Sequence, residues 1–341
     1  MSDVTIYTLA KELNMTPSMV SRALNPEGKI SEEKRKMVLA VAEKYHFRPN
    51  RFASRLSMKP IRIGVLICSK FKINSDKMIE GIRISHDELK DYKIEYDVSV
   101  FDSSVSDGEL SRILDRYQNA DGFVLSGMSS ARFTAVIDDL YAKKTNVVQV
   151  QSLNEEARTL FGSKHNERVA SGIAADFLQN CLGRMPRKNL LLFTGDLASS
   201  IHANAASAFA EACRIAGMTL LATVDMKDDA DYLRSLLPRV FGKYKEKVDG
   251  IYITSGVSLE LCRYIEENGI DIPLVAFDTY GEIKRYMEKG IISAAISQNV
   301  TKQMKVAFEA LVRHIMTGKE YPPVLYTDVN LMLKSNMHQF D

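Results

Sequence analysis

From Ile61 onward, short runs rich in β-branched residues alternate with amphipathic runs of helix length, and this alternation limits the fold more than any other feature of the chain. The predicted strands are Ile61–Cys68, Ile94–Phe101, Gly122–Ser126, Val147–Val150, Leu190–Thr194, Leu220–Val224, Gly250–Thr254, Leu274–Phe277 and Ile292–Ser297. The predicted helices are Asp76–Asp91, Asp107–Gln118, Ala131–Lys143, Glu167–Cys181, Ala203–Ala216, Ala230–Phe241, Leu259–Asn268, Glu282–Lys289 and Thr301–Thr317. Such alternation is typical of parallel sheets covered by helices on both faces, so we expect an α/β fold of the doubly wound class.

The number of predicted strands favours two sheets over one. Nine or ten parallel strands in one sheet are rarer than two sheets of five or six, and 341 residues exceed one ordinary domain. We therefore expect two lobes, the first beginning with residues 61–159 and the second with residues 163–290. Ligands in doubly wound sheets bind beyond the carboxyl ends of the strands, so the loops there are the places to look for a site.

Residues 4–56 have a different pattern, that of a small helical domain. The apolar residues Ile6, Leu9, Ala10 and Leu13 are spaced by three and four, which predicts a short helix with Thr5 before it as a candidate cap. A turn at Asn14 suits a residue that tolerates a left-handed backbone, and Pro17 favours the start of a second helix.

The second helix buries Val20, Ala23 and Leu24, and its outward positions are Ser18, Met19, Ser21 and Arg22. A helix-turn-helix places such positions in the major groove, where short hydrogen-bonding groups and a guanidinium can contact base edges. A third helix follows Ser31, with Glu32 and Glu33 in its first turn and an expected buried stripe of Met37, Val38, Val41, Ala42 and Tyr45.

Charge separates this segment from the rest of the chain. Residues 1–60 carry eleven Lys or Arg against six Asp or Glu, whereas the other 281 residues carry 34 against 37. A small basic domain is suited to phosphate neutralisation on nucleic acid. A generic helical subdomain is the alternative that the helical pattern alone leaves open.

The stretches VTIYTLAKELNMTPSMVSRALN, ISEEKRKMVL and FRPNRFASRL resemble the head and hinge of the LacI/GalR family of bacterial transcription repressors. The resemblance implies a helix-turn-helix domain over 1–46 and a hinge helix or linker over 47–60, in which Leu56 wedges into the minor groove of operator DNA. A linker leucine packed on the next domain is the alternative for Leu56. The DNA-contact residues that the pattern and the resemblance predict together are Thr5, Tyr7, Thr16, Pro17, Ser18, Met19, Ser21, Arg22, Asn25, Asn50, Arg51, Ala53, Arg55 and Leu56.

For residues 61–341 the resemblance implies a two-lobed, periplasmic-binding-protein-like core that binds an effector and dimerises. The chain is then expected to return to the first lobe over 292–322 and to end in the second lobe over 323–341. The segment VAFDTYGEIKRYMEKGIISAAISQNVTKQ resembles the family stretch that supplies an aspartate and a glutamine to the effector, so Asp278 and Gln298 become probable contacts.

The loops after the predicted strands carry mainly neutral hydrogen-bonding residues, which suit a small polar or polyhydroxylated ligand. The predicted effector residues are Phe71, Asn74, Ser126, His202, Asn204, Ser255, Asp278 and Gln298. Asp278, Gln298 and His202 could instead cap or flank nearby helices. Two departures from the family put an ordinary hexose in doubt: Ala205 stands where an arginine is common, and Ser255-Gly256 replaces an Asn-Asp pair.

Other classes lack their signatures. The four cysteines have no metal-binding spacing and are expected to be buried thiols, and we expect no cofactor and no metal. The sequence shows no nucleotide-binding, hydrolase or zinc-protease motif, so we do not expect an enzyme. With no signal peptide and no long apolar run, a cytoplasmic protein without membrane contact is expected.

These features predict a homodimeric regulator, most simply a repressor, that binds a near-palindromic operator in double-stranded DNA under the control of a carbohydrate-like effector. Three alternatives remain at this point. A partner protein could replace the small effector, the core could belong to a transport-type binding protein, or an unrecognised active site could exist. The effector, the operator, the direction of control and the choice of dimer or tetramer stay open.

Overall fold

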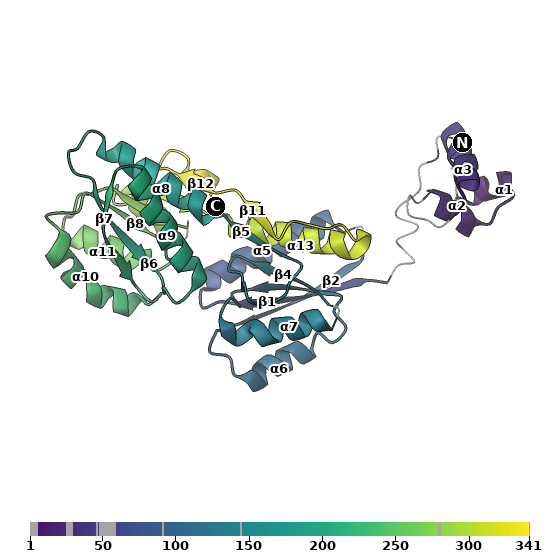
Figure 1. Ribbon diagram of the computed structural model, residues 1–341, viewed down its shortest axis with the longest axis horizontal. Helices are drawn as coiled ribbons and strands as arrows, with labels where there is room; N and C mark the ends of the chain where they lie inside the picture. Colours follow the sequence, from purple (N-terminus) through teal and green to yellow (C-terminus); the bar gives the residue numbers. More distant parts are fainter. Residues whose placement is uncertain are drawn as a thin grey trace. The chain divides into compact units, whose positions relative to one another are not determined.

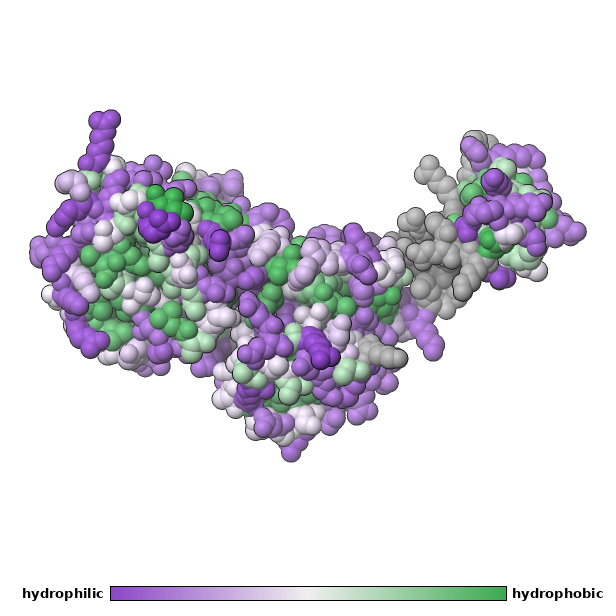
Figure 2. Space-filling model, viewed as in Figure 1, coloured by the Kyte–Doolittle hydropathy of each residue, from purple (hydrophilic) through white to green (hydrophobic). Residues whose placement is uncertain are grey.

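The computed structural model describes residues 6–24, 30–45, 47, 59–90, 92–143, 145–278 and 281–340. The chain divides into two compact units, one of Met1–Pro60 with Asp91–Lys93 and one of Ile61–Lys90 with Ile94–Asp341 (Figure 1). The predicted hinge helix lies outside the described residues. No helix among the described residues is long and apolar enough to cross a membrane, and hydrophilic residues are spread over the visible face of both units (Figure 2).

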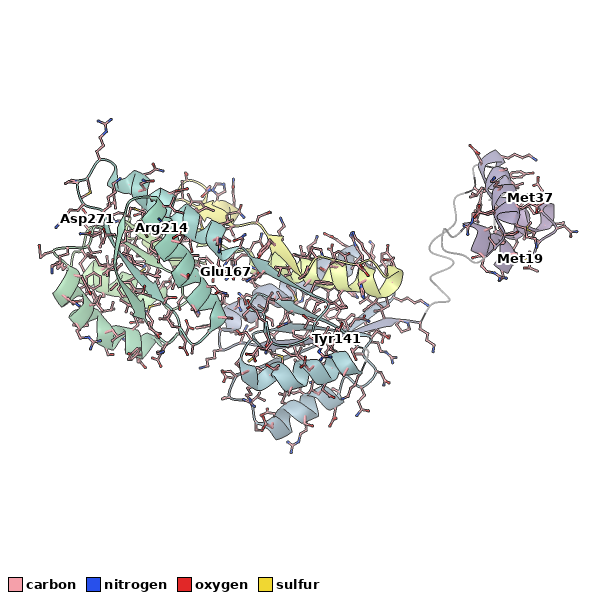
Figure 3. The ribbon with its side chains drawn as sticks, viewed as in Figure 1. Met19, Met37, Tyr141, Glu167, Arg214 and Asp271 are labelled. Carbon is pink, nitrogen blue, oxygen red and sulfur yellow. The ribbon has the colours of Figure 1, made fainter. Side chains whose placement is uncertain are left out.

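The N-terminal unit contains the expected three helices, α1 (Ile6–Glu12), α2 (Pro17–Leu24) and α3 (Glu32–Lys44). Asn14 has the left-handed backbone expected of the turn, with φ of 48°, and Pro17 opens α2. A small core holds Leu9, Ala10, Val20, Ala23, Val38 and Ala42. Met37 was expected to be buried but is 48% exposed, because Val38 and Ala42 form the buried face of α3 and Met37 lies outside it (Figure 3).

The core from Ile61 contains two six-stranded sheets. The first sheet has the order β11-β5-β4-β3-β1-β2 and is parallel throughout. Its strands are β1 (Ile61–Cys68), β2 (Ile94–Phe101), β3 (Gly122–Ser126), β4 (Asn146–Val150), β5 (Phe161–His165) and β11 (Val324–Thr327). One face packs on α6 (Asp107–Asp115), the 3-10 turn η1 (Ala131–Phe133) and α7 (Thr134–Ala142). The other face carries α5 (Lys72–Glu88) and α13 (Val300–Thr317), which lie side by side (Figure 1).

The second sheet has the order β12-β10-β9-β8-β6-β7, and only β12 is antiparallel. Its strands are β6 (Asn189–Thr194), β7 (Thr219–Asp225), β8 (Gly250–Ile253), β9 (Leu274–Phe277), β10 (Ala294–Ser297) and β12 (Asn330–Met332). One face packs on α8 (Glu167–Leu182) and α9 (Ser200–Ile215). The other packs on α10 (Ala230–Tyr244), α11 (Ser258–Glu267) and α12 (Ile283–Glu288), and the 3-10 turn η2 (Met337–Gln339) follows β12. The prediction of two doubly wound, largely parallel sheets is confirmed.

The crossings between the lobes differ from the expected boundaries. β5 belongs to the first sheet, so the first crossing follows His165 and does not fall between residues 159 and 163. β10 pairs with β9 in the second sheet, so residues 292–297 do not belong to the first lobe as expected. The chain returns to the first sheet through α13 and β11 and crosses a third time before β12. The strands β5, β11 and β12 are short and contain polar residues, so their apolar pattern was too weak to place these crossings.

The cysteines follow the prediction in three of four cases. Cys68, Cys213 and Cys262 are buried thiols, whereas Cys181 is exposed near the end of α8, and that expectation was wrong. Burial raises the pKa of the Cys213 and Cys262 thiols to about 12, which makes them poor nucleophiles.

Candidate functional site

The outward face of α2 is polar and accessible. Ser18, Ser21 and Arg22 are exposed, whereas Met19 is only half-exposed (Figure 3). Arg22 lies along its own helix, where its Nε donates to the Ser18 carbonyl over 3.3 Å. Such a contact is weak and solvent-exposed, so it does not fix the guanidinium in one position.

Thr16 has a structural role in addition to its predicted one. Its Oγ1 accepts a hydrogen bond from the Met19 backbone N–H over 3.3 Å, so it caps the start of α2, and its side chain remains exposed. Pro17 is half-buried at the first helical position, and Tyr7 is 71% exposed on α1. The other predicted DNA contacts, Thr5, Asn25, Asn50, Arg51, Ala53, Arg55 and Leu56, lie outside the described residues.

Two contacts join α3 to the other two helices of this unit. Arg35 of α3 donates from Nη1 to the Ala23 carbonyl near the end of α2, over 3.2 Å. Lys44 at the end of α3 pairs with Glu12 of α1, with 3.0 Å between Nζ and Oε1. The sequence pattern did not show that α3 supplies these cations, although both lie on one basic helix.

In the core, a cavity of about 640 Å³ lies between the two lobes, at the carboxyl ends of their strands. The first lobe contributes residues that follow β1, β3 and β4, and the second contributes residues that follow β6, β7, β8 and β9. Side chains of mixed polar and aromatic character line it, which suits a small molecule held by a few hydrogen bonds.

Asp278 and Gln298 meet at the carboxyl ends of the paired strands β9 and β10. Gln298 donates from Nε2 to Asp278 Oδ2 over 3.0 Å, and both side chains line the cavity. Gln303 of α13 donates to the Gln298 carbonyl over 2.8 Å. Asp278 has a left-handed backbone, with φ of 68°. It does not cap α12, whose cap position is Glu282, and Asn299 rather than Gln298 caps α13.

His165, at the end of β5, is a cavity residue that the sequence analysis missed. Its ring is 2% exposed and lies 5.3 Å from the Phe277 ring, centroid to centroid. Burial lowers the pKa of His165 to about 4, although Glu167 and a hydrogen bond with Gln298 act in the opposite direction. The ring is therefore neutral near pH 7, and Nδ1 has no hydrogen-bond partner among the described residues.

A second missed group is centred on Asp228, which follows β7 in a left-handed turn with Lys227. Asp228 accepts hydrogen bonds from the Ser255 hydroxyl over 2.6 Å and from the Asp196 N–H over 3.2 Å. His202 Nε2 lies 3.1 Å from its second oxygen. Burial alone would raise the pKa of Asp228, but the contacts with His202 and Ser255 outweigh it and lower the pKa to about 2.

Gly195 makes room for this carboxylate group. A Cβ at Gly195 would lie 2.3 Å from Asp228 Oδ1 and 2.4 Å from His202 Nε2, far inside contact distance. Lys227 pairs with Asp225 over 2.6 Å and with Asp196 over 3.0 Å on the same wall. On the first lobe, Asn74 and Gln151 exchange two amide hydrogen bonds of 3.2 and 3.3 Å.

Two family models match the chain. The model described as periplasmic binding protein domain matches residues 76–320, more than half of the chain. The model described as bacterial regulatory proteins, lacI family, matches residues 5–50, the helix-turn-helix unit. This chain belongs to the LacI family. The predicted recognition is confirmed.

Curated relatives of this LacI-family chain are transcription regulators. HTH-type transcriptional regulator pepR1 of Lactobacillus delbrueckii subsp. lactis is 26% identical over 221 residues, which cover 59% of this chain and 58% of the relative. Catabolite control protein A of Priestia megaterium is 23% identical over 291 residues, which cover 81% and 82%. The match to pepR1 thus spans less than two thirds of that relative.

Solved structures share the fold of the core. GanP, a glucose-galactose binding protein from Geobacillus stearothermophilus, aligns with a TM-score of 0.71 at 19% identity, over 82% of this chain and 99% of its own. At this identity the likeness concerns the fold alone. It agrees with the two lobes and the parallel sheets described above.

Six of the eight predicted effector residues line the cavity: Phe71, Asn74, His202, Ser255, Asp278 and Gln298. Ser126 does not, because its side chain is 2% exposed at the end of β3 and lies outside the lining. Asn204 lies on a separate groove between α8 and α9, since two residues along a helix turn it about 200° from His202.

The departures from the family fall on the cavity wall. Ala205 lines the cavity, so no guanidinium is present at that position, and Ser255 with Gly256 lines it near Asp228. The wall that could have held an arginine clamp instead carries the Asp228, His202 and Ser255 group. Lys70, Lys227, Asp196 and Glu167 also line the cavity and were not predicted.

Proposed function

We propose that this regulator is a repressor that binds a near-palindromic operator as a homodimer and responds to a small, polar, carbohydrate-like molecule in the inter-lobe cavity. The observation that carries the proposal is the combination, in one chain, of an accessible polar helix α2 with a polar cavity of about 640 Å³. One reader helix covers one half-site, and two-fold symmetry supplies the second at a fixed spacing.

Cavity chemistry supports a hydroxyl-rich ligand. Asp278, Gln298 and His165 offer a carboxylate, an amide and a neutral imidazole at one end, and aromatic rings such as Phe277 and Phe71 can pack on an apolar ring face. The name of GanP refers to glucose and galactose, which makes these two sugars reasonable first probes. Because Ala205 stands where the family often has an arginine, we expect a ligand that does not need two parallel hydrogen bonds from a guanidinium.

Control of DNA binding through the cavity needs only a modest coupling. A hinge segment as short as residues 47–60 is marginal as a helix in isolation, so its pairing on DNA is sensitive to how the cores are arranged. A coupling of about 1–3 kcal/mol changes the affinity for the operator roughly 5- to 150-fold. We propose that Leu56 and the other hinge residues carry this effect to the minor groove.

The test starts with the full-length protein and a pool of random duplex DNA. Repeated selection should enrich one inverted repeat, and the selected duplex should bind far more tightly than a scrambled duplex of the same composition at the same salt concentration. Sedimentation of the complex should give two chains per duplex. Enrichment of no sequence, or binding of one chain to one half-site, would contradict the proposal.

The ligand is sought by thermal shift with glucose, galactose, pentoses, polyols, sugar acids and sugar phosphates. A cavity ligand raises the melting temperature by mass action and should change affinity for the selected duplex. If DNA binding is specific but no compound stabilises the core, a partner protein becomes the better candidate for the controlling signal.

A further inference from the structure

The charged side chains that line the cavity are mainly carboxylates. Among the described residues, the lining holds Glu167, Asp196, Asp228 and Asp278 against Lys70 and Lys227. Two lysines outside the lining offset part of this excess. Lys164 pairs with Glu167 over 2.9 Å. Burial lowers the pKa of Lys77 on α5, and the charge of Asp278 opposes that shift, so Lys77 and Asp278 interact across the lobes.

The rest of the excess lies on the wall formed by residues at and after the ends of β6 and β7. Lys227 supplies an ammonium group here, and it is shared by Asp225 over 2.6 Å and Asp196 over 3.0 Å. Asp228 is the next residue, and its neighbour His202 is charged only when it is protonated. Three carboxylates of this wall therefore share one lysine among the described residues.

Asp228 can accept a further hydrogen bond from the cavity. A carboxylate offers about four acceptor sites. Oδ1 accepts from the Ser255 hydroxyl, and Oδ2 accepts from the Asp196 N–H and lies 3.1 Å from His202 Nε2. The side chain lines the cavity and is 28% exposed, so a small donor group can reach it. Against the effect of burial, the contacts with His202 and Ser255 lower the pKa of Asp228 to about 2, so it is ionised at neutral pH.

Ala205 leaves room beside this carboxylate. His202 and Ala205 are three residues apart on α9, so they lie one turn apart on the same face, and both line the cavity. The methyl group of Ala205 fills little of this space and brings no charge. A cation that balances Asp228 and Asp196 can therefore come from the ligand.

We propose that the ligand of this cavity carries a protonated amine, as an amino sugar does, and that the amine binds beside Ala205 and donates to Asp228. An ammonium group brings three donors and a positive charge to a wall of carboxylates. A phosphate or carboxylate on the ligand is repelled by the same wall. The inference rests on the proposed function, because it specifies the ligand of the same cavity.

Pairs of compounds that differ in charge test the proposal on the full-length protein. Calorimetric titration compares glucose with glucosamine, galactose with galactosamine, and sorbitol with glucamine, and gluconate serves as the anion. At least one amine should bind roughly 10- to 150-fold more tightly than its neutral parent, and gluconate should bind more weakly than glucose. No binding by any of the three amines, or binding no tighter than that of their parents, would overturn the proposal.

Variants of the wall show where the amine binds. Ala205→Arg places a guanidinium in the open space, so it should remove the preference for the amine and strengthen the binding of gluconate. Ser207→Arg adds the same charge to α9 outside the cavity, on the groove beside α8, and should keep the preference. Asp228→Asn should weaken the binding of the amine several-fold more than that of its parent. An unchanged preference in both Ala205→Arg and Asp228→Asn would also overturn the proposal.

Failure of this proposal differs from failure of the proposed function. If a neutral sugar binds best and changes the affinity for the selected duplex, the proposed function stands and the amine is wrong. If the DNA selection enriches no sequence, the proposed function fails. The titrations contain no DNA, so they still decide whether the cavity prefers an amine.

Discussion

Gln298 donates from Nε2 to Asp278 Oδ2 over 3.0 Å, which joins the residue that begins the second lobe crossing to a carboxylate of the cavity. The two residues directly follow β10 and β9, which are paired in parallel, so their side chains reach the same edge of the sheet. A ligand that contacts Asp278 therefore also acts on the segment that leads into α13.

Replacement of Asp278 by Asn should remove the response to the cavity ligand. Asn tolerates the left-handed backbone at this position, so the fold should be kept, whereas Ala would add backbone strain. Loss of one charged hydrogen-bond acceptor should weaken binding by about 1–3 kcal/mol, or roughly 5- to 150-fold. The measurement is a calorimetric titration with the compound that the thermal-shift screen identifies.

Asp271→Asn is the control for that experiment. Asp271 is exposed before β9, at the opposite end of the strand from the cavity (Figure 3), so the same chemical change there should leave ligand binding intact. Equal binding by the Asp278→Asn variant and the wild type would remove Asp278 from the ligand contacts.

Replacement of Arg22 by Ala should reduce discrimination between DNA sequences. A guanidinium that contacts a base edge contributes about 1–3 kcal/mol to that discrimination, so affinity for the selected duplex should fall roughly 5- to 150-fold, with a smaller loss on scrambled DNA. Lys36→Ala removes an exposed charge from α3 and should weaken binding to both duplexes equally. Anisotropy titrations at one salt concentration decide the matter, since an equal loss for Arg22→Ala would assign Arg22 to phosphate.

Replacement of Gly195 by Ala should disrupt the Asp228 group. The new Cβ would have to displace Asp228 Oδ1 and His202 Nε2, so we expect a loss of about 1–3 kcal/mol in the free energy of unfolding and weaker ligand binding. Gly242→Ala in α10 meets no atom within 4 Å and should be neutral or stabilising. Urea unfolding compares the two variants, and a harmless Gly195→Ala would show that the group tolerates displacement.

His165 should make the core less stable in mild acid. The unfolded ring takes up a proton near pH 6.5, whereas the buried ring resists protonation until about pH 4. The unfolded state therefore binds more protons in that window, and stability falls as the pH drops from about 6.5 towards 4, by roughly 3 kcal/mol at the lower end. Urea unfolding across this range should show a smaller loss for His165→Gln than for the wild type.

The exposed His338 offers a matched control, because His338→Gln changes the same side chain outside the cavity and the crossings. That variant should follow the wild type through the acid range. If His165→Gln also follows the wild type, the buried ring is not responsible for the acid sensitivity.

Much of the fold could be predicted because its signals are local. Asn14 and Pro17 mark the turn of the helix-turn-helix, and long apolar runs mark the central strands. The missed strands β5, β11 and β12 are short, lie at or near sheet edges and contain polar residues, so periodicity could not find them. Because these strands were not predicted, the predicted boundaries between the lobes were also wrong.

The cavity was predicted in part for a related reason. Residues that directly follow central strands, such as Ser255 and Asp278, could be placed by the rule that parallel strands end at a common edge. His165 ends β5, a strand that was not predicted. Asp228 reaches the cavity through a left-handed turn at Lys227 and Asp228, and the sequence around these two residues did not indicate that turn. Asn204 does not reach the cavity because it lies two residues after His202 on α9 and faces the groove beside α8.

The last edge strands of both sheets come from the final part of the chain, with β11 completing the first sheet and β12 the second. During synthesis from the N-terminus, the helix-turn-helix unit can therefore fold long before either lobe has all of its strands. A nascent chain stopped after Gly318 would carry a complete helix-turn-helix unit on a core that lacks one edge strand in each sheet. Under the proposed function, translation thus passes through a period in which DNA binding is not yet under ligand control.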